Sequence, residues 1–114
     1  MGVDFSKCDN FLFAASFENC QLDYCSFYQK KMKKATFADC SLKEVDFAEV
    51  DLSMAVFTNC DLTGASFMGT VLEKTDFRTA KNYAFDPEQN RVKKAKFSLA
   101  GVAGLLTKYN IDIE

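Results

Sequence analysis

The chain of 114 residues contains no histidine and no tryptophan, and it has a single proline, Pro87. Histidine is the usual acid–base catalyst near neutral pH and the commonest metal ligand in proteins. Without it, a cysteine or serine nucleophile lacks its usual base. We therefore predict that the protein is not an enzyme, that it has no catalytic or cofactor-binding residues, and that it acts on no small-molecule substrate.

The cysteines are few, and their spacing matches no disulfide or metal-binding motif. Their number, five, is odd and no two of them form a CxxC pair, so a disulfide framework is not expected and we predict reduced thiols. Cys20, Cys40 and Cys60 recur every twenty residues. A straight column of thiols without imidazole does not offer zinc a tetrahedral ligand set, so this spacing favours core packing over a metal site.

Long apolar runs and a charge excess are also missing. No segment approaches the roughly 18 apolar residues of a membrane span, and the first ten residues lack the features of a signal peptide. We predict a cytoplasmic protein without a membrane partner. The 14 basic and 16 acidic side chains give a net charge of -2, so overall charge favours neither a nucleic-acid binder nor a strongly acidic partner. The length suits one small domain.

What the chain does have is a five-residue repeat. From Leu12 onward every fifth residue is large and apolar, and neither a helix nor an ordinary strand places such a series on one face. The series is Leu12, Phe17, Leu22, Phe27, Met32, Phe37, Leu42, Phe47, Leu52, Phe57, Leu62, Phe67, Leu72 and Phe77. A column of mostly small residues lies two positions earlier, and internal similarity is best at twenty residues. The pattern predicts four-sided coils in which residues twenty apart stack at about 4.8 Å.

The repeat resembles the pentapeptide-repeat family, whose motif Ala-Asp/Asn-Leu/Phe-X-X corresponds to Ala35-Thr36-Phe37, Val50-Asp51-Leu52, Cys60-Asp61-Leu62 and Ala65-Ser66-Phe67. The resemblance implies an all-β fold, a right-handed quadrilateral β-helix. We expect a single solenoid over 1–114, with an irregular first coil over 1–14, regular coils over 15–81, an interrupted last coil over 82–97, and a C-terminal helix and strand over 98–114.

The pattern is interrupted in three places. Near the N-terminus the register shifts by two residues, so we expect a distorted first coil. No capping element precedes the first pentad, which suggests a truncated or shortened version of a longer solenoid. Lys30 occupies a small-residue position, where we expect its amine to reach water from a widened corner, with a ligand-facing lysine as the alternative. Asn82 and Pro87 stand where large apolar residues are expected, which predicts an outward loop before the register returns at Val92 and Phe97.

The C-terminal segment predicts a short amphipathic α-helix over residues 99–108, capped by Ser98 and ended by Asn110. Gly101 and Gly104 permit a close approach to another backbone, so we expect the helix to cover the open end of the last coil. The quinolone-resistance branch of the family is similar in joining two subunits through an apolar C-terminal helix and strand. The resemblance implies a homodimer, and the candidate interface consists of Val102, Leu105, Leu106, Tyr109, Ile111 and Ile113.

Sorting outward charges by their place in the coil separates the two signs. One side is basic, with the candidate residues Lys31, Lys33, Lys34, Lys74, Arg91, Lys93 and Lys94 against Asp51 and Glu73. The adjoining side carries the candidate acidic residues Asp46, Glu49, Asp86 and Glu88 and no basic residue. Both sides could equally be ordinary solvated surface.

These patterns favour a non-enzymatic protein-interaction module. The family resemblance implies a specific partner, since some members imitate duplex DNA and bind type II topoisomerases, DNA gyrase in particular. Five coils span about 24 Å, over which duplex DNA carries on the order of 14 charges, far more than this chain. Two alternatives stay open: weak nucleic-acid binding through the basic side, and a structural fragment of a longer solenoid.

Overall fold

The structure is a computed structural model in which residues 15–112 are described. Its strands β1 (Ser16–Glu18), β2 (Thr36–Ala38) and β3 (Val56–Thr58) form a parallel sheet in the order β1-β2-β3. Phe17 pairs with Phe37, and Phe37 with Phe57, so the register is twenty residues. Each strand is only three residues long because a turn follows within every pentad.

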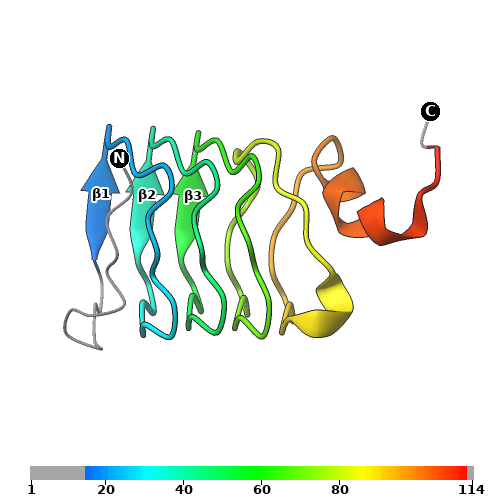
Figure 1. The fold of residues 1–114 in the computed structure, drawn as a ribbon, viewed down its shortest axis with the longest axis horizontal. Helices are drawn as coiled ribbons and strands as arrows, with labels where there is room; N and C mark the ends of the chain where they lie inside the picture. The colour runs from blue at the N-terminus through cyan, green and yellow to red at the C-terminus, as the bar shows by residue number, and fades with distance from the viewer. Residues whose placement is uncertain (1–14, 113–114) are drawn as a thin grey trace.

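Bridges outside these strands repeat the same twenty-residue register on three further sides of each coil. Gln21 pairs with Ser41, Ser26 with Asp46, and Lys31 with Asp51, all in parallel. Equivalent pairs continue through Val71 with Arg91 and Asp76 with Lys96. Four pairing positions per twenty residues define a β solenoid of four-sided coils, which Figure 1 shows stacked in a row along an axis of 42 Å.

The corners of the coils are tight turns that place one residue in the left-handed region. In the turn Leu22–Cys25 the amide of Cys25 donates to the carbonyl of Leu22 at 3.1 Å, and the third residue, Tyr24, has φ 65°. A positive φ at the third position is the signature of a type II turn, which normally favours glycine or asparagine there. The same position recurs with positive φ at Gln29, Lys34, Glu44 and nine other residues up to Lys94, of which two are glycines, so most corners carry a left-handed side chain without glycine's freedom.

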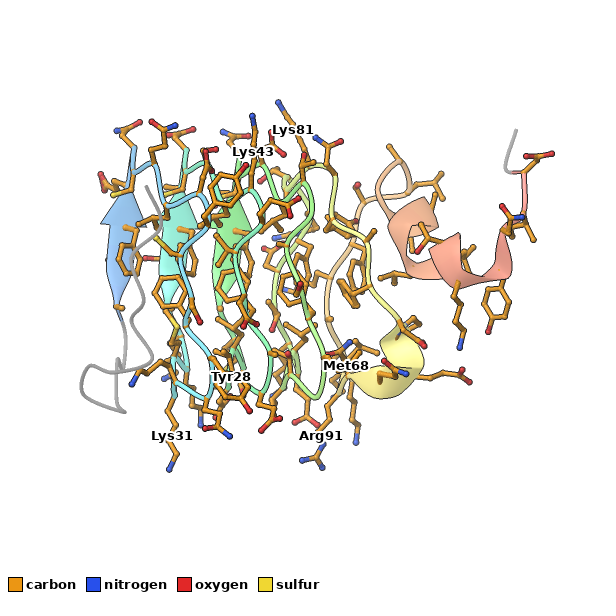
Figure 2. All side chains as sticks on the ribbon, in the orientation of Figure 1. Tyr28, Lys31, Lys43, Met68, Lys81 and Arg91 are labelled. Carbon is orange, nitrogen blue, oxygen red and sulfur yellow. The ribbon has the colours of Figure 1, made fainter. Side chains whose placement is uncertain are left out.

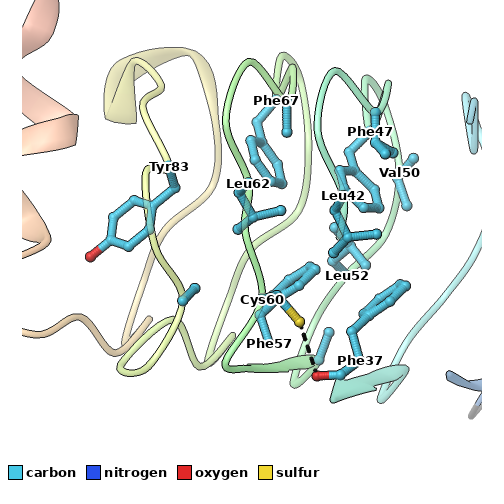
Figure 3. Packing of buried hydrophobic residues seen from close by; sticks show 14 of the residues in the cluster. Phe37, Leu42, Phe47, Val50, Leu52, Phe57, Cys60, Leu62, Phe67 and Tyr83 are labelled. Carbon is cyan, nitrogen blue, oxygen red and sulfur yellow. Dashed lines mark hydrogen bonds between the residues drawn. The ribbon is translucent and has the colours of Figure 1, made fainter. Parts of the chain in front are cut away.

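The interior is built from columns of stacked side chains. Phe17, Phe37, Phe57, Phe77 and Phe97 stack nearly parallel, with ring centroids 4.9–5.4 Å apart. A second column of Phe27, Phe47 and Phe67 meets the first edge to face, and Figure 3 shows the leucines packed beside them. Burying each phenylalanine contributes roughly 1.5–3 kcal/mol, and each aromatic pair about 0.5–1.5 kcal/mol more. The phenylalanine excess therefore serves the core.

The interruption after Ala80 is filled from within, which corrects the prediction of a purely outward loop. Tyr83 and Phe85 are 3% and 7% exposed. The ring centroids of Phe85 and Phe67 are 5.2 Å apart, so Phe85 continues the column of Phe27, Phe47 and Phe67 in place of Pro87. The ring of Tyr83 packs against that of Phe77, with centroids 5.3 Å apart. Only the turn beyond them, with the 3-10 helix η2 (Pro87–Gln89), has no buried residue. The chain shifts register by two residues here because burying two aromatic rings outweighs keeping the spacing.

The C-terminal helix is η3 (Val102–Tyr109), a 3-10 helix that starts three residues later than the predicted α-helix. Ser98 caps the turn before it, since its Oγ accepts from the amide of Gly101 at 3.0 Å. A Cβ on Gly104 would lie 2.0 Å from the carbonyl oxygen of Tyr83, and Phe85 donates to the carbonyl of Gly104 at 3.2 Å. The glycine thus allows the backbone contact that seats η3 beyond the last coil (Figure 1).

The structure also tests the predictions for Lys30 and for the end of the C-terminal helix. Lys30 is 1% exposed, so the prediction that its amine reaches water is wrong. Its position in the coil directs Cα–Cβ inward, as for Val50 and Thr70 twenty and forty residues later, and the side chain follows into the interior. Asn110 ends η3 in the left-handed region as predicted, but Ile111 and Asp112 belong to no strand. Ile113 and the irregular first coil over 1–14 lie outside the described residues.

Candidate interaction surfaces

The seven residues predicted for the basic side all lie exposed on one side of the solenoid, here called the basic face. Bridges join Lys31 to Asp51, Asp51 to Val71 and Val71 to Arg91, so this row crosses four successive coils. Figure 2 shows Lys31 and Arg91 projecting from the same side and Lys43 and Lys81 from the opposite one. The regular coil spacing therefore places residues sixty apart in sequence on one surface.

The carboxylates on the basic face are already engaged. Asp51 accepts from the amide of Ser53 at 3.0 Å and from its hydroxyl, and Glu73 lies 3.8 Å from the Arg91 guanidinium. The lysines there form no ion pair with any residue in the range 15–112: Lys31, Lys33, Lys34, Lys74, Lys93 and Lys94. On other faces Lys43 and Arg78 do pair with aspartates. The unpaired positive charge is thus concentrated on the basic face.

A cleft of about 260 Å³ opens on the basic face at the corner of the last two coils. It is lined by Glu73, Lys74, Lys93 and Lys94. The two coils are held together there by the amide of Lys74, which donates to the carbonyl of Lys93 at 3.0 Å. The walls of the cleft are therefore hydrogen-bonded backbone corners that carry exposed lysine side chains.

The predicted acidic side is less negative than its sequence suggests. Lys108 of η3 forms ion pairs with Asp86, at 3.3 Å, and with Glu88. The prediction that no basic residue reaches this side is therefore wrong, because the terminal helix folds back beside the turn 86–89 and brings its own charge. Glu49 accepts from the side-chain amide of Gln29 at 3.0 Å, and Asp46 from the amide of Ala48 at 2.9 Å. Asp46 and Glu49 are the two carboxylates there without an ammonium partner among the described residues.

Large apolar side chains of the described residues are exposed in two groups, in addition to Tyr24 and Leu99. Tyr28 and Met68, at equivalent positions two coils apart, are 38% and 58% exposed on the side that carries Asp46. The second group lies at the C-terminal end, where Leu106, Tyr109 and Ile111 are exposed. Val102 and Leu105 of the predicted dimer interface are instead half-buried, and Leu105 packs against the core. Two of the six residues of the predicted interface are thus partly buried within one subunit.

Of the cysteines in residues 15–112, Cys25, Cys40 and Cys60 are buried, Cys20 is half-buried, and none is in a disulfide. Burial raises the pKa of Cys60 to about 11 and raises that of Cys40 in the same direction. A thiol held protonated is a poor nucleophile and a poor metal ligand. In residues 15–112 no three side chains of the histidine, cysteine, aspartate or glutamate type gather as a metal site would require, and no helix in that range has the length and apolarity to cross a bilayer.

The small-residue column also has a role that the spacing did not reveal. Thr70 and Thr75 donate their hydroxyls to the carbonyls of Phe47 and Leu52, each twenty-three residues earlier. Cys60 does the same to Phe37 through its thiol at 3.3 Å, drawn as a dashed line in Figure 3, and Asn90 to Phe67 at 3.1 Å. In the sequence, the recurrence of small side chains with a donor group in this column could have predicted these hydrogen bonds.

With coil, register and faces described, the class of protein is clear. A family model described as "Pentapeptide repeat region" matches residues 11–83, more than half of the chain, and the chain belongs to the pentapeptide-repeat family. A comparison with curated protein sequences finds no significant match.

Several solved structures are similar. Rfr23, a pentapeptide repeat protein from the cyanobacterium Cyanothece 51142, is 17% identical, with a TM-score of 0.35 over 75% of this chain and 62% of its own. HetL, from Nostoc sp. strain PCC 7120 and involved in heterocyst differentiation regulation, is 18% identical, with a TM-score of 0.45 over 84% of this chain and 46% of its own. The chain thus spans less than two thirds of either relative.

A third similar structure is trypsin-treated QnrB1, a plasmid-mediated fluoroquinolone resistance protein. It is 14% identical, with a TM-score of 0.26 over 100% of this chain and 99% of its own. At this degree of similarity none of the three structures carries an argument about function, which has to come from the surfaces of this chain.

Proposed function

We propose that the protein is a non-enzymatic protein-interaction module that dimerises through its C-terminal segment and offers its flat charged faces to a protein partner. The observation that carries the proposal is the exposed apolar surface at that end, where Leu106, Tyr109 and Ile111 are 36%, 54% and 54% exposed. Exposed apolar side chains gathered at one place mark interaction sites more often than single scattered ones do. We also take the protein to be cytoplasmic, a single solenoid domain and, as the family implies, right-handed.

Light scattering tests the dimer. Leu106→Asp should give monomers, because it places a charge in the apolar contact without touching the core of the subunit. Leu105→Asp is unsuitable, since Leu105 packs against that core. Thr107→Asp is the matched control, an exposed neighbour in the same helix that should leave the dimer intact. If the Leu106 variant stays dimeric, or if the unchanged protein is a monomer, the C-terminal interface is refuted.

DNA gyrase is the specific partner that we propose to test first, by analogy with the topoisomerase-binding members of the family. The side with Asp46, Glu49, Asp86 and Glu88 supports a short acidic contact. Its charge is partly offset by Lys108, so it can imitate only a brief stretch of duplex. A supercoiling assay with and without ciprofloxacin decides the matter. An Asp46→Lys, Glu49→Lys variant should lose any effect, and the absence of an effect at micromolar unchanged protein removes gyrase as the partner.

A further inference from the structure

We propose that the cleft formed by Glu73, Lys74, Lys93 and Lys94 is a binding site for a phosphate-bearing anion. This inference does not depend on the protein partner or the dimer proposed above, because it concerns a different surface. Three ammonium groups and one carboxylate line the cleft, which gives it two net positive charges. A cleft with an excess of positive charge concentrates anions more strongly than a flat surface with the same charge does.

The acidic residue in the wall does not cancel the site. Glu73 faces the Arg91 guanidinium at 3.8 Å, so its charge is already balanced from outside the cleft lining. Lys74, Lys93 and Lys94 have no ion pair within residues 15–112. Each ammonium can donate three hydrogen bonds, and lysine binds phosphate as a compact point charge. The three lysines are thus available to an anion with several oxygens.

The backbone adds a donor at the same corner. In the preceding coil the amide of Lys74 donates to the carbonyl of Lys93. The equivalent amide of Lys94 has no such partner within the described range, because no coil follows it there. Lys74 and Lys94 occupy equivalent corners of successive coils, and both have a left-handed backbone, with φ 60° and 61°. The last coil therefore ends, on the basic face, in an amide that no carbonyl satisfies.

Size limits the ligand. The volume of about 260 Å³ is below the roughly 300–1,000 Å³ of pockets that enclose drug-sized molecules. A carboxylate offers one charge and two oxygens, whereas a di- or triphosphate offers several of each and matches the net charge better. The source could be a free polyphosphate or the phosphodiester backbone of a nucleic acid, and the chemistry of recognition is the same.

Calorimetric titration of the full chain with inorganic triphosphate at low salt tests the site. We expect one triphosphate per chain, and Lys74→Gln or Lys94→Gln should each weaken binding about fivefold, as the loss of one charged contact implies. Lys34→Gln is the matched control, because Lys34 holds the same corner position, with φ 64°, on the same face but outside the cleft. It should change the affinity less than twofold.

The amide chemical shifts of the unchanged protein locate the site in the same titration. They should move around Lys93 and Lys94. No binding at millimolar triphosphate, shifts centred on residues 31–34, or equal losses in the Lys34 and Lys94 variants would each overturn the proposal, the last by showing diffuse attraction. The substituted side chains of Lys34, Lys74 and Lys94 are exposed, and circular dichroism verifies that the three variants are folded.

A second arm distinguishes the two sources of phosphate. A single-stranded oligothymidylate is titrated against the triphosphate complex. If it displaces triphosphate, and Lys94→Gln weakens its binding, the phosphodiester backbone is the source. If it does not displace triphosphate, the site selects a free polyphosphate. Either result supports a phosphate site, and neither bears on dimerisation or on gyrase.

Discussion

The hydroxyl of Thr70 donates a 2.8 Å hydrogen bond to the carbonyl of Phe47, a residue on the neighbouring coil. This bond joins two coils through the interior, where no water replaces a lost partner. Thr75 and Leu52 repeat the arrangement at 2.7 Å. The small-residue column thus supplies hydrogen-bond donors to buried carbonyls as well as space for the phenylalanines.

Thr70→Val should therefore destabilise the protein by about 1–3 kcal/mol, because valine keeps the shape and leaves the Phe47 carbonyl without its donor. Urea unfolding followed by circular dichroism measures the change. Thr70→Ser keeps the hydroxyl, so we expect it to lose clearly less stability than Thr70→Val. Equal stability of the valine variant and the unchanged protein would show that the bond contributes nothing.

Lys34→Gly should stabilise the protein by about 0.5–1 kcal/mol. Lys34 is exposed and has φ 64°, a conformation that costs a side-chain-bearing residue energy and glycine none. Lys33→Gly is the control, since its φ is not positive and the change should destabilise through chain entropy alone. Thermal unfolding measures the change in stability of both variants. The two changes should have opposite signs if the corner is strained, and the same sign if it is not.

Gly104→Ala should detach η3 from the last coil, because the new Cβ would lie 2.0 Å from the Tyr83 carbonyl oxygen. The amide of Phe85, which donates to the Gly104 carbonyl, reports on this contact. Its hydrogen exchange should accelerate at least about tenfold while amides of the central coils change little. Tyr109→Phe, an exposed change in the same helix, should leave the rate as it is. Unchanged protection in the Gly104 variant would mean that η3 is held elsewhere.

Stability should fall in alkali through Cys60. Burial raises the pKa of its thiol to about 11 in the folded protein, from its ordinary value of 9.0. The folded state then holds this proton more tightly, so the stabilisation is complete below pH 9 and is lost as the pH rises toward 11. The loss should be on the order of 2 kcal/mol.

Cys60→Ser isolates that effect, because serine can still donate to Phe37 and does not titrate in this range. The difference in unfolding free energy between the two proteins should grow between pH 9 and 11. Lysines and tyrosines titrate equally in both and cancel. Parallel pH profiles would contradict the assignment.

The sequence by itself determined the coil. A large apolar residue at every fifth position, best repeated at twenty, leaves few ways to bury all of them, and Phe17, Phe37 and Phe57 stack as that spacing requires. The basic face followed for the same reason, since the fixed register converts position in the repeat into position on the surface. Lys31 and Arg91 could be placed together without any knowledge of contacts.

The tertiary structure alone decided what happens where the repeat ends. Tyr83 and Phe85 enter the core one and two residues away from the repeat positions Asn82 and Pro87, because burying rings in the open coil outweighs an ideal turn, and no periodicity encodes that balance. Lys108 reaches Asp86 and Glu88 because η3 folds back, and Lys30 enters the interior because the coil fixes its Cα–Cβ direction. Repeat spacing specifies contacts between equivalent positions, whereas these contacts join unlike positions and depend on three-dimensional packing.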